Sequence, residues 1–281
     1  MQFGKSAKSV IEMEEVRSYY NKKAKSYDEV FEMFVFKILD AITWKYLEPY
    51  LPKNPEALVL DAGGGTGRWA IRMAERGCRV VLIDASEEML KVAARNVKQA
   101  GLEDRITVKK DDIASTEYAD ESFDMVFCEQ TLFLFKEPST LLEEMNRVLK
   151  KKAKLIISAQ NLYAQCLASI SEKPNPDTMD NTLKTLLRKR YNTMANAGKV
   201  KIHTWTPDEF REMLERNGFH VEKIVGKGTT MPLRISKDLF MKKKYPEDLY
   251  KKTLEFELAL CEKPDALALA GHLQAIAHKK N

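Results

Sequence analysis

Between residues 57 and 160, short apolar segments alternate with segments of helical periodicity, and this alternation constrains the fold more than any other feature. The expected strands are Ala57–Asp61, Arg79–Asp84, Ile106–Lys110, Phe123–Cys128 and Leu155–Ala159. The intervening segments 66–76, 86–100 and 139–150 have the spacing of amphipathic helices. This alternation predicts βαβ units and a parallel sheet with helices on both faces.

The same pattern resumes after residue 200. Thr206, Pro207 and Glu209 form a capping-box signature for a helix that ends near Gly218. Phe219–Val225 and His272–His278 are expected to be a sixth and a seventh strand. We therefore divide the chain into a core and the segments around it: an N-terminal helical lid 1–56, a core 57–160, an insertion 161–200, core 201–227, a second insertion 228–266 and a last strand within 267–281.

Composition narrows the class of protein. Apolar residues make up 44% of the 281 residues, enough for a large core, yet no apolar run approaches the roughly 18–20 residues of a membrane span. The four cysteines contain no CxxC pair, and the four histidines lack the spacing of metal ligands, so no metal site is expected. The start of the chain lacks a signal peptide pattern, so we expect a cytoplasmic protein with no membrane span.

A glycine-rich turn follows the first predicted strand and opens a helix, and an acid ends the second strand. The turn has the spacing Asp61-x-Gly63-x-Gly65-x-Gly67, and Asp84 lies where a carboxylate can accept both hydroxyls of a ribose. The GxGxxG pattern of nicotinamide cofactors would need a glycine where Arg68 stands, and no P-loop is present. A carboxylate at the turn repels pyrophosphate but suits an ammonium group. This pattern favours an adenosine ligand that carries an amino acid.

S-adenosylmethionine is such a ligand, and here the chain resembles the class I S-adenosylmethionine-dependent methyltransferases, in the branch that modifies small molecules. Several motifs support the resemblance in order along residues 18–160 and 202–228. They are Tyr20-x-x-x-Ala24-x-x-Tyr27-Asp28, the turn from Asp61 to Gly67, Asp84-Ala85-Ser86 with Met89-Leu90, Asp111-Asp112-Ile113 before Ser122-Phe123-Asp124, and Glu144 with Arg147-Val148-Leu149. The chain departs from the family at Lys151-Lys152-Ala153, where the family usually has Pro-Gly-Gly.

The resemblance implies a fold and a cofactor site. The fold would be an α/β, Rossmann-like, doubly wound sheet of seven mostly parallel strands in the order 3-2-1-4-5-7-6, with strand 7 antiparallel and a helical cap. The cofactor would be S-adenosylmethionine, leaving as S-adenosylhomocysteine. The implied cofactor-binding residues are Tyr20, Tyr27, Asp61, Gly63, Gly65, Gly67, Asp84, Ala85, Met89, Asp112, Ile113 and Cys128, the last through a nearby main-chain carbonyl. Tyr20 and Glu129 are the candidate catalytic residues.

The acceptor is less constrained by the sequence. Cys128-Glu129-Gln130-Thr131 stands where enzymes acting on adenine or amide nitrogens have Asn/Asp-Pro-Pro-Tyr/Phe, and no Pro-Cys dipeptide is present to attack cytosine. We expect direct SN2 transfer to a small molecule beneath a helical cap, in a monomer or homodimer that does not bind DNA. The alternative is an RNA or protein methyltransferase that uses the basic stretches 161–200 and 226–263, each with a net charge of +3. A third reading is a non-catalytic, cofactor-binding partner subunit.

Overall fold

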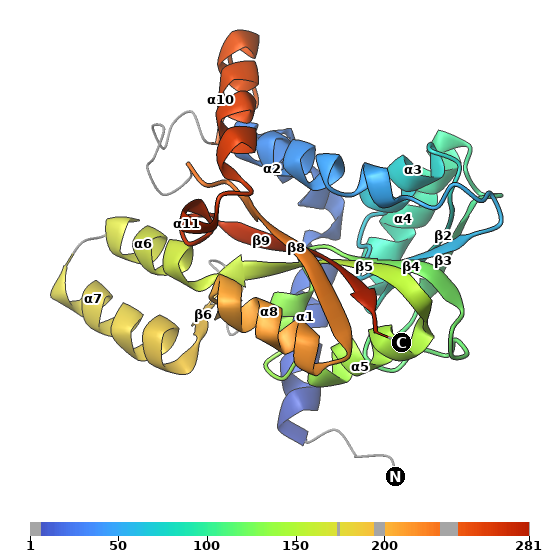
Figure 1. The fold of residues 1–281 in the computed structure, drawn as a ribbon, viewed down its shortest axis with the longest axis horizontal. Helices are drawn as coiled ribbons and strands as arrows, with labels where there is room; N and C mark the ends of the chain where they lie inside the picture. Colours follow the sequence, from blue (N-terminus) through green and yellow to red (C-terminus); the bar gives the residue numbers. More distant parts are fainter. Residues whose placement is uncertain (1–6, 173–174, 194–199, 231–240, 281) are drawn as a thin grey trace.

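A mixed β-sheet organises the computed structural model, which describes residues 7–172, 175–193, 200–230 and 241–280. Nine strands lie in these ranges: β1 (Leu58–Ala62), β2 (Arg79–Asp84), β3 (Ile106–Lys110), β4 (Phe123–Cys128), β5 (Leu149–Asn161), β6 (Tyr191–Thr193), β7 (Lys201–Trp205), β8 (Phe219–Lys227) and β9 (His272–Lys279). The order along the main path is β3-β2-β1-β4-β5-β7-β6, while β9 pairs with both β5 and β8 (Figure 1).

The predicted fold class is confirmed, with one difference in the sheet. β9 lies antiparallel to β5 and to β8, in the places expected for strands 7 and 6. The difference is the short antiparallel pair of β6 and β7, which the sequence pattern did not predict and which joins the end of β5 through Gln160 and Asn161. Both strands are only three to five residues long, too short for alternation to identify.

Helices cover both faces of the sheet. The helical segments are α1 (Ala7–Lys23), η1 (Ala24–Glu32), α2 (Phe34–Lys45), η2 (Glu48–Tyr50), α3 (Arg68–Ala74), α4 (Glu87–Ala100), η3 (Leu132–Leu134), α5 (Ser139–Val148), α6 (Leu162–Glu172), α7 (Pro176–Thr182), η4 (Leu183–Arg188), α8 (Pro207–Arg216), α10 (Glu247–Leu260) and α11 (Pro264–Leu267). One face packs against α2, α3 and α4 through a core that includes Ile42, Trp69 and Ala93. The other packs against α5 and α8 through a core that includes Leu142 and Phe210.

Parallel pairing places the functional ends of three strands side by side. Asp61 of β1 is in register with Leu82 of β2 and with Phe127 of β4. Because parallel strands end at the same edge of a sheet, the segments that follow β1, β2 and β4 meet there. The glycine turn, Asp84 and Glu129 are thereby brought to one edge.

Local signals in the sequence explain where the helices of the core begin and end. The Ser86 hydroxyl accepts a hydrogen bond from the Met89 backbone N–H at the start of α4, and Gly101 ends that helix in the left-handed region. Thr206 and Glu209 form the predicted capping box of α8. At the departure from the family pattern, Lys152 adopts a φ of 60° within β5, so a lysine occupies left-handed backbone where the family usually has glycine.

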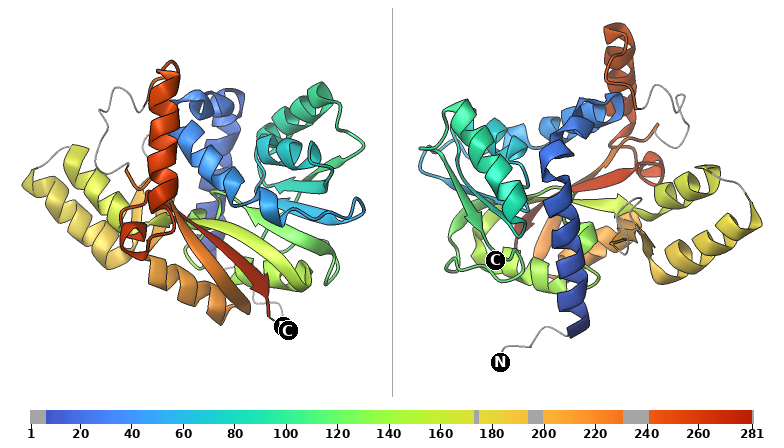
Figure 2. Two further views of the ribbon diagram at one scale, coloured as in Figure 1. Left: turned by 45° about the horizontal axis from the view of Figure 1, so that its top comes forward. Right: turned by 180° about the vertical axis from the view of Figure 1, so that it is seen from behind.

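The segments around the core extend from it in separate directions. Figure 1 shows α6 and α7 extending to one side of the sheet and α10 rising beside α2, and Figure 2 shows α1 running across the molecule. Parts of both predicted insertions, residues 194–199 and 231–240, lie outside the described residues. Among the helices that the structure describes, none combines the length and apolar character needed to cross a membrane.

Candidate active site

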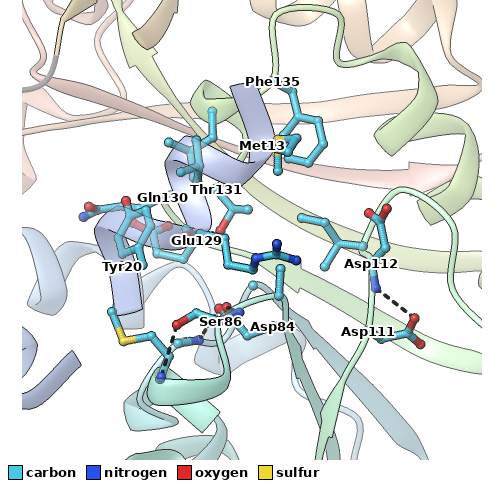
Figure 3. A pocket seen from close by; sticks show the side chains of 18 of the residues that line it. Met13, Tyr20, Asp84, Ser86, Asp111, Asp112, Glu129, Gln130, Thr131 and Phe135 are labelled. Atoms are coloured by element: carbon cyan, nitrogen blue, oxygen red, sulfur yellow. Dashed lines mark hydrogen bonds between the residues drawn. The ribbon is translucent and has the colours of Figure 1, made fainter. Parts of the chain in front are cut away.

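A cavity opens at the edge where β1, β2 and β4 end. It encloses about 710 Å³ of empty space, its open mouth included. Figure 3 shows side chains from α1, from the ends of β2 and β4 and from the turn after β3 converging on it. Its lining comprises Met13, Val16, Arg17, Tyr20, Tyr27, Gly63, Gly65, Asp84, Ala85, Ser86, Met89, Asp111, Asp112, Ile113, Glu129, Gln130, Thr131, Leu134 and Phe135.

The glycine turn forms the floor of the cavity. Gly65 has a φ of +55°, and a Cβ built there would approach only the Tyr27 ring, at 3.9 Å. A Cβ at Gly63 would instead lie 2.5 Å from the Thr131 hydroxyl. Gly63 is therefore required by the packing of the turn against the segment after β4, whereas Gly65 keeps open the space into which a ligand can approach the backbone.

Asp84 is bonded to the loops on both sides of it. Its Oδ2 accepts a hydrogen bond of 3.0 Å from the Gly65 backbone N–H, and its Oδ1 accepts one of 2.8 Å from the Ser86 N–H. Burial raises the pKa of Asp84, and the two N–H donors act in the opposite direction. The carboxylate is thus held in place at the cavity wall, where it can accept the hydroxyls of a ribose.

Asp61 lies directly behind the glycine turn and is 2% exposed. Its Oδ2 has no hydrogen-bond partner among the described residues. Burial, followed by the charge of Asp84, raises the pKa of Asp61 to about 7. A buried carboxylate oxygen without a donor is costly, and an ammonium group bound at the turn would relieve that cost. This observation fits a ligand with an amino group and disfavours pyrophosphate.

Two tyrosines and a methionine form the wall on the side of the N-terminal segment. The Tyr20 and Tyr27 rings meet edge to face, 6.0 Å apart, and pack with Met89. Burial raises the pKa of Tyr27 to about 12 and that of Tyr20 well above its ordinary value. Both phenols therefore stay protonated at neutral pH, and each can donate a hydrogen bond.

Helix α1 covers the cavity. Met13, Val16, Arg17 and Tyr20 recur at helical spacing and all line it. The next residue, Asn21, accepts a 2.7 Å hydrogen bond on its side chain from the Ser86 hydroxyl, which ties α1 to the start of α4. None of the described residues of the two predicted insertions lines this cavity. The cover over the cavity comes from the N-terminal segment, and a role for the insertions as a cap stays a prediction.

The turn after β3 forms the opposite end of the cavity. Asp112 and Ile113 both line it, and their predicted contacts with adenine stay a prediction. The Asp112 backbone N–H donates to Asp111 Oδ1 at 2.8 Å, and the Ala114 N–H donates to Asp112 Oδ1 at 3.0 Å. These bonds fix the turn locally and leave its side chains directed along the cavity wall, as Figure 3 shows for Asp112.

Glu129 occupies the turn after β4, beside the tyrosines. One of its carboxylate oxygens, Oε1, lies 2.6 Å from the ammonium nitrogen of Lys227, at the end of β8. The side chains of Glu129 and Lys227 are 6% and 0% exposed. The other oxygen of Glu129, Oε2, is buried without a hydrogen-bond partner among the described residues. Of the two predicted catalytic residues, Glu129 has a carboxylate oxygen that could accept a hydrogen bond from a ligand.

Of the predicted cofactor-binding residues, three do not line the cavity. Asp61 and Gly67 support the turn from behind, and a Cβ at Gly67 would contact Leu82 and Ala93. Cys128 is fully buried in the core on the α5 and α8 face, and burial raises the pKa of its thiol, which stays protonated. Any contact of Cys128 with a ligand would therefore be through its main chain, as predicted.

Sequence reasoning missed part of the lining and the partner of Glu129. The missed side chains from α1 are Met13, Val16 and Arg17, and their spacing with Tyr20 was the signal that could have found them. No feature of the sequence pointed to Lys227, because the predicted strand ended at Val225, two residues before it. No group of three or more His, Cys, Asp or Glu residues able to hold a metal ion occurs in the described part of the chain.

Comparison with known proteins agrees with this geometry. Residues 53–218 match the family model described as "Methyltransferase domain". The chain belongs to this family, and it is an enzyme of the methyltransferase class. The tRNA 5-carboxymethoxyuridine methyltransferase of Escherichia coli strain K12 is 26% identical over 91% of this chain and 96% of its own length.

Two further proteins resemble this chain, one over only half of its length and one with low sequence identity. The demethylmenaquinone methyltransferase of Porphyromonas gingivalis is 32% identical over 51% of this chain and 60% of its own length, so the match spans little more than half of that enzyme. A solved structure from Listeria monocytogenes, described as an S-adenosylmethionine-dependent methyltransferase, superposes with a TM-score of 0.60 at 19% identity, over 86% of this chain and 99% of that one. This structural likeness supports the fold.

Proposed function

We propose that this enzyme transfers the methyl group of S-adenosylmethionine to a compact acceptor bound beneath α1. One observation carries the proposal: the acidic side chains Asp84, Asp111 and Asp112 line the cavity, together with Glu129, whose charge Lys227 balances, and the lining has a single basic side chain, Arg17. Such a lining attracts a cofactor with a sulfonium and an ammonium group. It repels the phosphates of a nucleic acid that would have to approach the same opening.

The residues of this chain would divide the work as follows. Asp84 binds the ribose, Asp61 balances the ammonium charge, and Gly65 allows the backbone to approach. The bound cofactor supplies a methyl group already activated on a positively charged sulfur. The protein then has to align the acceptor lone pair and exclude water. Tyr20, Tyr27 and Met89 exclude water at the wall, and Glu129 offers a carboxylate oxygen to an N–H or O–H of the acceptor.

RNA is the second candidate acceptor, because a specific finding favours it. The relative that matches this chain nearly end to end is described as a tRNA methyltransferase, whereas the demethylmenaquinone relative matches over 51% of the chain. An RNA acceptor would need basic groups outside the acidic cavity. Lys184, Arg188 and Lys189, in and next to η4, are exposed and could supply them.

A labelled-methyl assay separates these candidates. The protein is incubated with S-adenosylmethionine carrying a labelled methyl group and with cell extract, which is then separated into small-molecule, RNA and protein fractions. We expect label in the small-molecule fraction, and none with heat-denatured protein. Label in RNA that disappears after ribonuclease treatment would overturn the small-molecule proposal. No transfer to any fraction would favour the non-catalytic subunit.

We place the reaction in the cytoplasm. All four cysteines are buried and none forms a disulfide, although the chain is large enough to contain several. Free thiols are typical of a reducing compartment. The absence of transfer in a cytosolic extract, together with transfer in a membrane or periplasmic extract, would contradict this placement.

A further inference from the structure

A fully buried lysine lies next to the candidate acceptor site. The Lys227 side chain at the end of β8 is 0% exposed, and its ammonium group donates hydrogen bonds to Glu129 Oε1 at 2.6 Å and to the Thr43 hydroxyl at 3.0 Å. Thr43 lies on α2 and is itself buried. Lysine is rarely buried to this extent, and taking a charge out of water is costly even when the charge is paired.

The surroundings of Lys227 single out Glu129 as its counter-charge. Across the β8–β9 pair, Lys227 is in register with His272. Burial, and then the charge of Lys227, lowers the pKa of His272 to about 3, so the imidazole is neutral. The pair of Lys227, at the end of β8, and Glu129, in the turn after β4, is thus a buried contact between charges that are far apart in sequence. Such pairs are weak evidence for stability, because apolar residues of similar volume stabilise a core as well or better.

The backbone after β4 fixes the other side of Glu129. Gln130 adopts a φ of 54°, which is unusual for a residue other than glycine. Its backbone N–H donates to the Ser158 hydroxyl at 2.8 Å, and the Thr131 hydroxyl donates to the Glu129 carbonyl at 3.1 Å. A strained turn held by neighbouring side chains is typical of functional sites. The turn and Lys227 together fix the carboxylate.

The second carboxylate oxygen of Glu129, Oε2, lacks a hydrogen-bond donor in the described part of the protein. Oε2 is buried, yet Glu129 lines the cavity. The proposed function assigns the amino group of the cofactor to Asp61, whose Oδ2 is also unpartnered among the described residues. The donor missing at Glu129 would then come from the second ligand, the methyl acceptor.

We propose that Lys227 is a positioning residue, which holds the Glu129 carboxylate so that Oε2 accepts a hydrogen bond from an N–H or O–H of the methyl acceptor. This inference rests on the proposed function, because it requires that an acceptor bind beside Glu129. The acceptor is therefore a molecule with a hydrogen-bond donor next to the atom that is methylated. Fixing that donor aligns the acceptor lone pair with the bond to be broken.

The experiment compares Lys227→Met, which removes the donor, with Lys227→Arg, which keeps a cation. Each variant is measured for its affinity for S-adenosylmethionine by calorimetry, for thermal unfolding, and for the rate of label transfer to the extract fraction that the wild-type protein labels. We expect Lys227→Met to bind the cofactor within about threefold of wild type and to transfer methyl at least about thirtyfold more slowly, a loss of about 2 kcal/mol at 1.4 kcal/mol per tenfold. Lys227→Arg should recover part of the rate.

The matched control is Lys223→Met on the same strand. Lys223 pairs with Glu262 at 2.8 Å, away from the cavity lining. This variant should keep the wild-type rate within about twofold. Unchanged transfer in Lys227→Met would overturn the inference. So would a loss of cofactor affinity as large as the loss of rate, because the pair would then serve the cofactor.

A double variant covers the case in which Lys227→Met leaves Glu129 as an unpaired buried charge and does not fold. Lys227→Met combined with Glu129→Gln removes both charges and is expected to fold and to bind the cofactor. Near-wild-type transfer by the double variant would show that the pair is only structural and would overturn the inference. Lost transfer with retained cofactor binding would show that the Glu129 carboxylate is needed, as the inference requires. Label in RNA would contradict the proposed small-molecule acceptor but not the role of Lys227. That role would still be tested by the ratio of variant to wild-type transfer rates on the RNA.

Discussion

Asp84 and Gly65, at the ends of two neighbouring strands, are joined by a hydrogen bond of 3.0 Å from the Gly65 backbone N–H to Asp84 Oδ2. The acid that would bind the ribose therefore also holds the loop that forms the floor of the cavity. This contact links the two motifs from which the cofactor was inferred, the glycine turn and the acid at the end of β2. Substitutions at either residue are therefore expected to affect cofactor binding.

Loss of the Asp84 carboxylate should weaken cofactor binding strongly. Asp84→Ala removes a pair of charge-assisted hydrogen bonds to the ribose, each worth about 1.5–3 kcal/mol, and releases Gly65. We expect the dissociation constant for S-adenosylmethionine to rise by roughly ten- to a thousandfold in calorimetry. The exposed Asp104 is the control, since Asp104→Ala should leave the affinity unchanged. Equal affinities of wild type and Asp84→Ala would refute the ribose assignment.

A side chain at Gly65 should exclude the cofactor. Gly65→Val fills the open space above the loop, where only the Tyr27 ring lies within 4 Å. Gly101→Val is a matched control, because Gly101 has a similar φ of +65° and a Cβ built there would meet nothing within 4 Å. Both variants should lose similar stability on thermal unfolding, and only Gly65→Val should lose binding. Binding lost in both variants would mean that backbone strain, and not the cavity, is responsible.

Asp61 should make the ligand-free protein less stable as the pH rises. Its pKa in the folded protein is about 7, above the value of about 3.9 of an unfolded chain. The folded state therefore binds more protons between about pH 4 and 7, and the free energy of unfolding falls across that window. Asp61→Asn cannot ionise, so its stability advantage over wild type should be larger at pH 8 than at pH 5. Thermal unfolding without ligand checks this, and an equal difference at both pH values would contradict it.

Replacing three lysines of the second insertion tests the acceptor class. If Lys242, Lys243 and Lys244 contact RNA, their replacement by Gln should reduce transfer, and transfer should fall steeply as salt rises, because bound phosphates release counterions. For a compact acceptor, we expect less than about a threefold change and a nearly flat rate between roughly 50 and 200 mM salt. Lys243 already has a partner in Glu29, 3.6 Å away, in agreement with that expectation.

The parts of the fold that the sequence predicted are those fixed by local interactions. The cap at Ser86, the glycine that ends α4 and the capping box at Thr206 each depend on residues within one turn of helix. The glycine turn and Asp84 were identifiable because a strand end and a helix start leave few alternatives for such residues. Nine of the twelve predicted cofactor residues lie in the cavity lining, and those outside the turn and the end of β2, such as Tyr20 and Asp112, came from the family resemblance.

The parts that the sequence did not predict depend on long-range contacts. Lys227 and Glu129 are 98 residues apart, and only the closure of β9 between β5 and β8 brings them together. The hydrogen bond between Asn21 and Ser86, which ties α1 to the start of α4, spans 65 residues. The short strand β7 pairs with β5 at Gln160 and Asn161, beyond Ile157, where the pairing of β5 with β4 ends, and β6 pairs with β7 in turn.

A calorimetric titration of the wild-type protein with S-adenosylmethionine, and separately with NAD, tests the central claim most directly. The acidic turn at Asp61 and the ribose acid Asp84 predict saturable binding of one S-adenosylmethionine per chain and no heat with NAD. Binding of NAD, or no binding of S-adenosylmethionine by protein that unfolds cooperatively, would contradict the account.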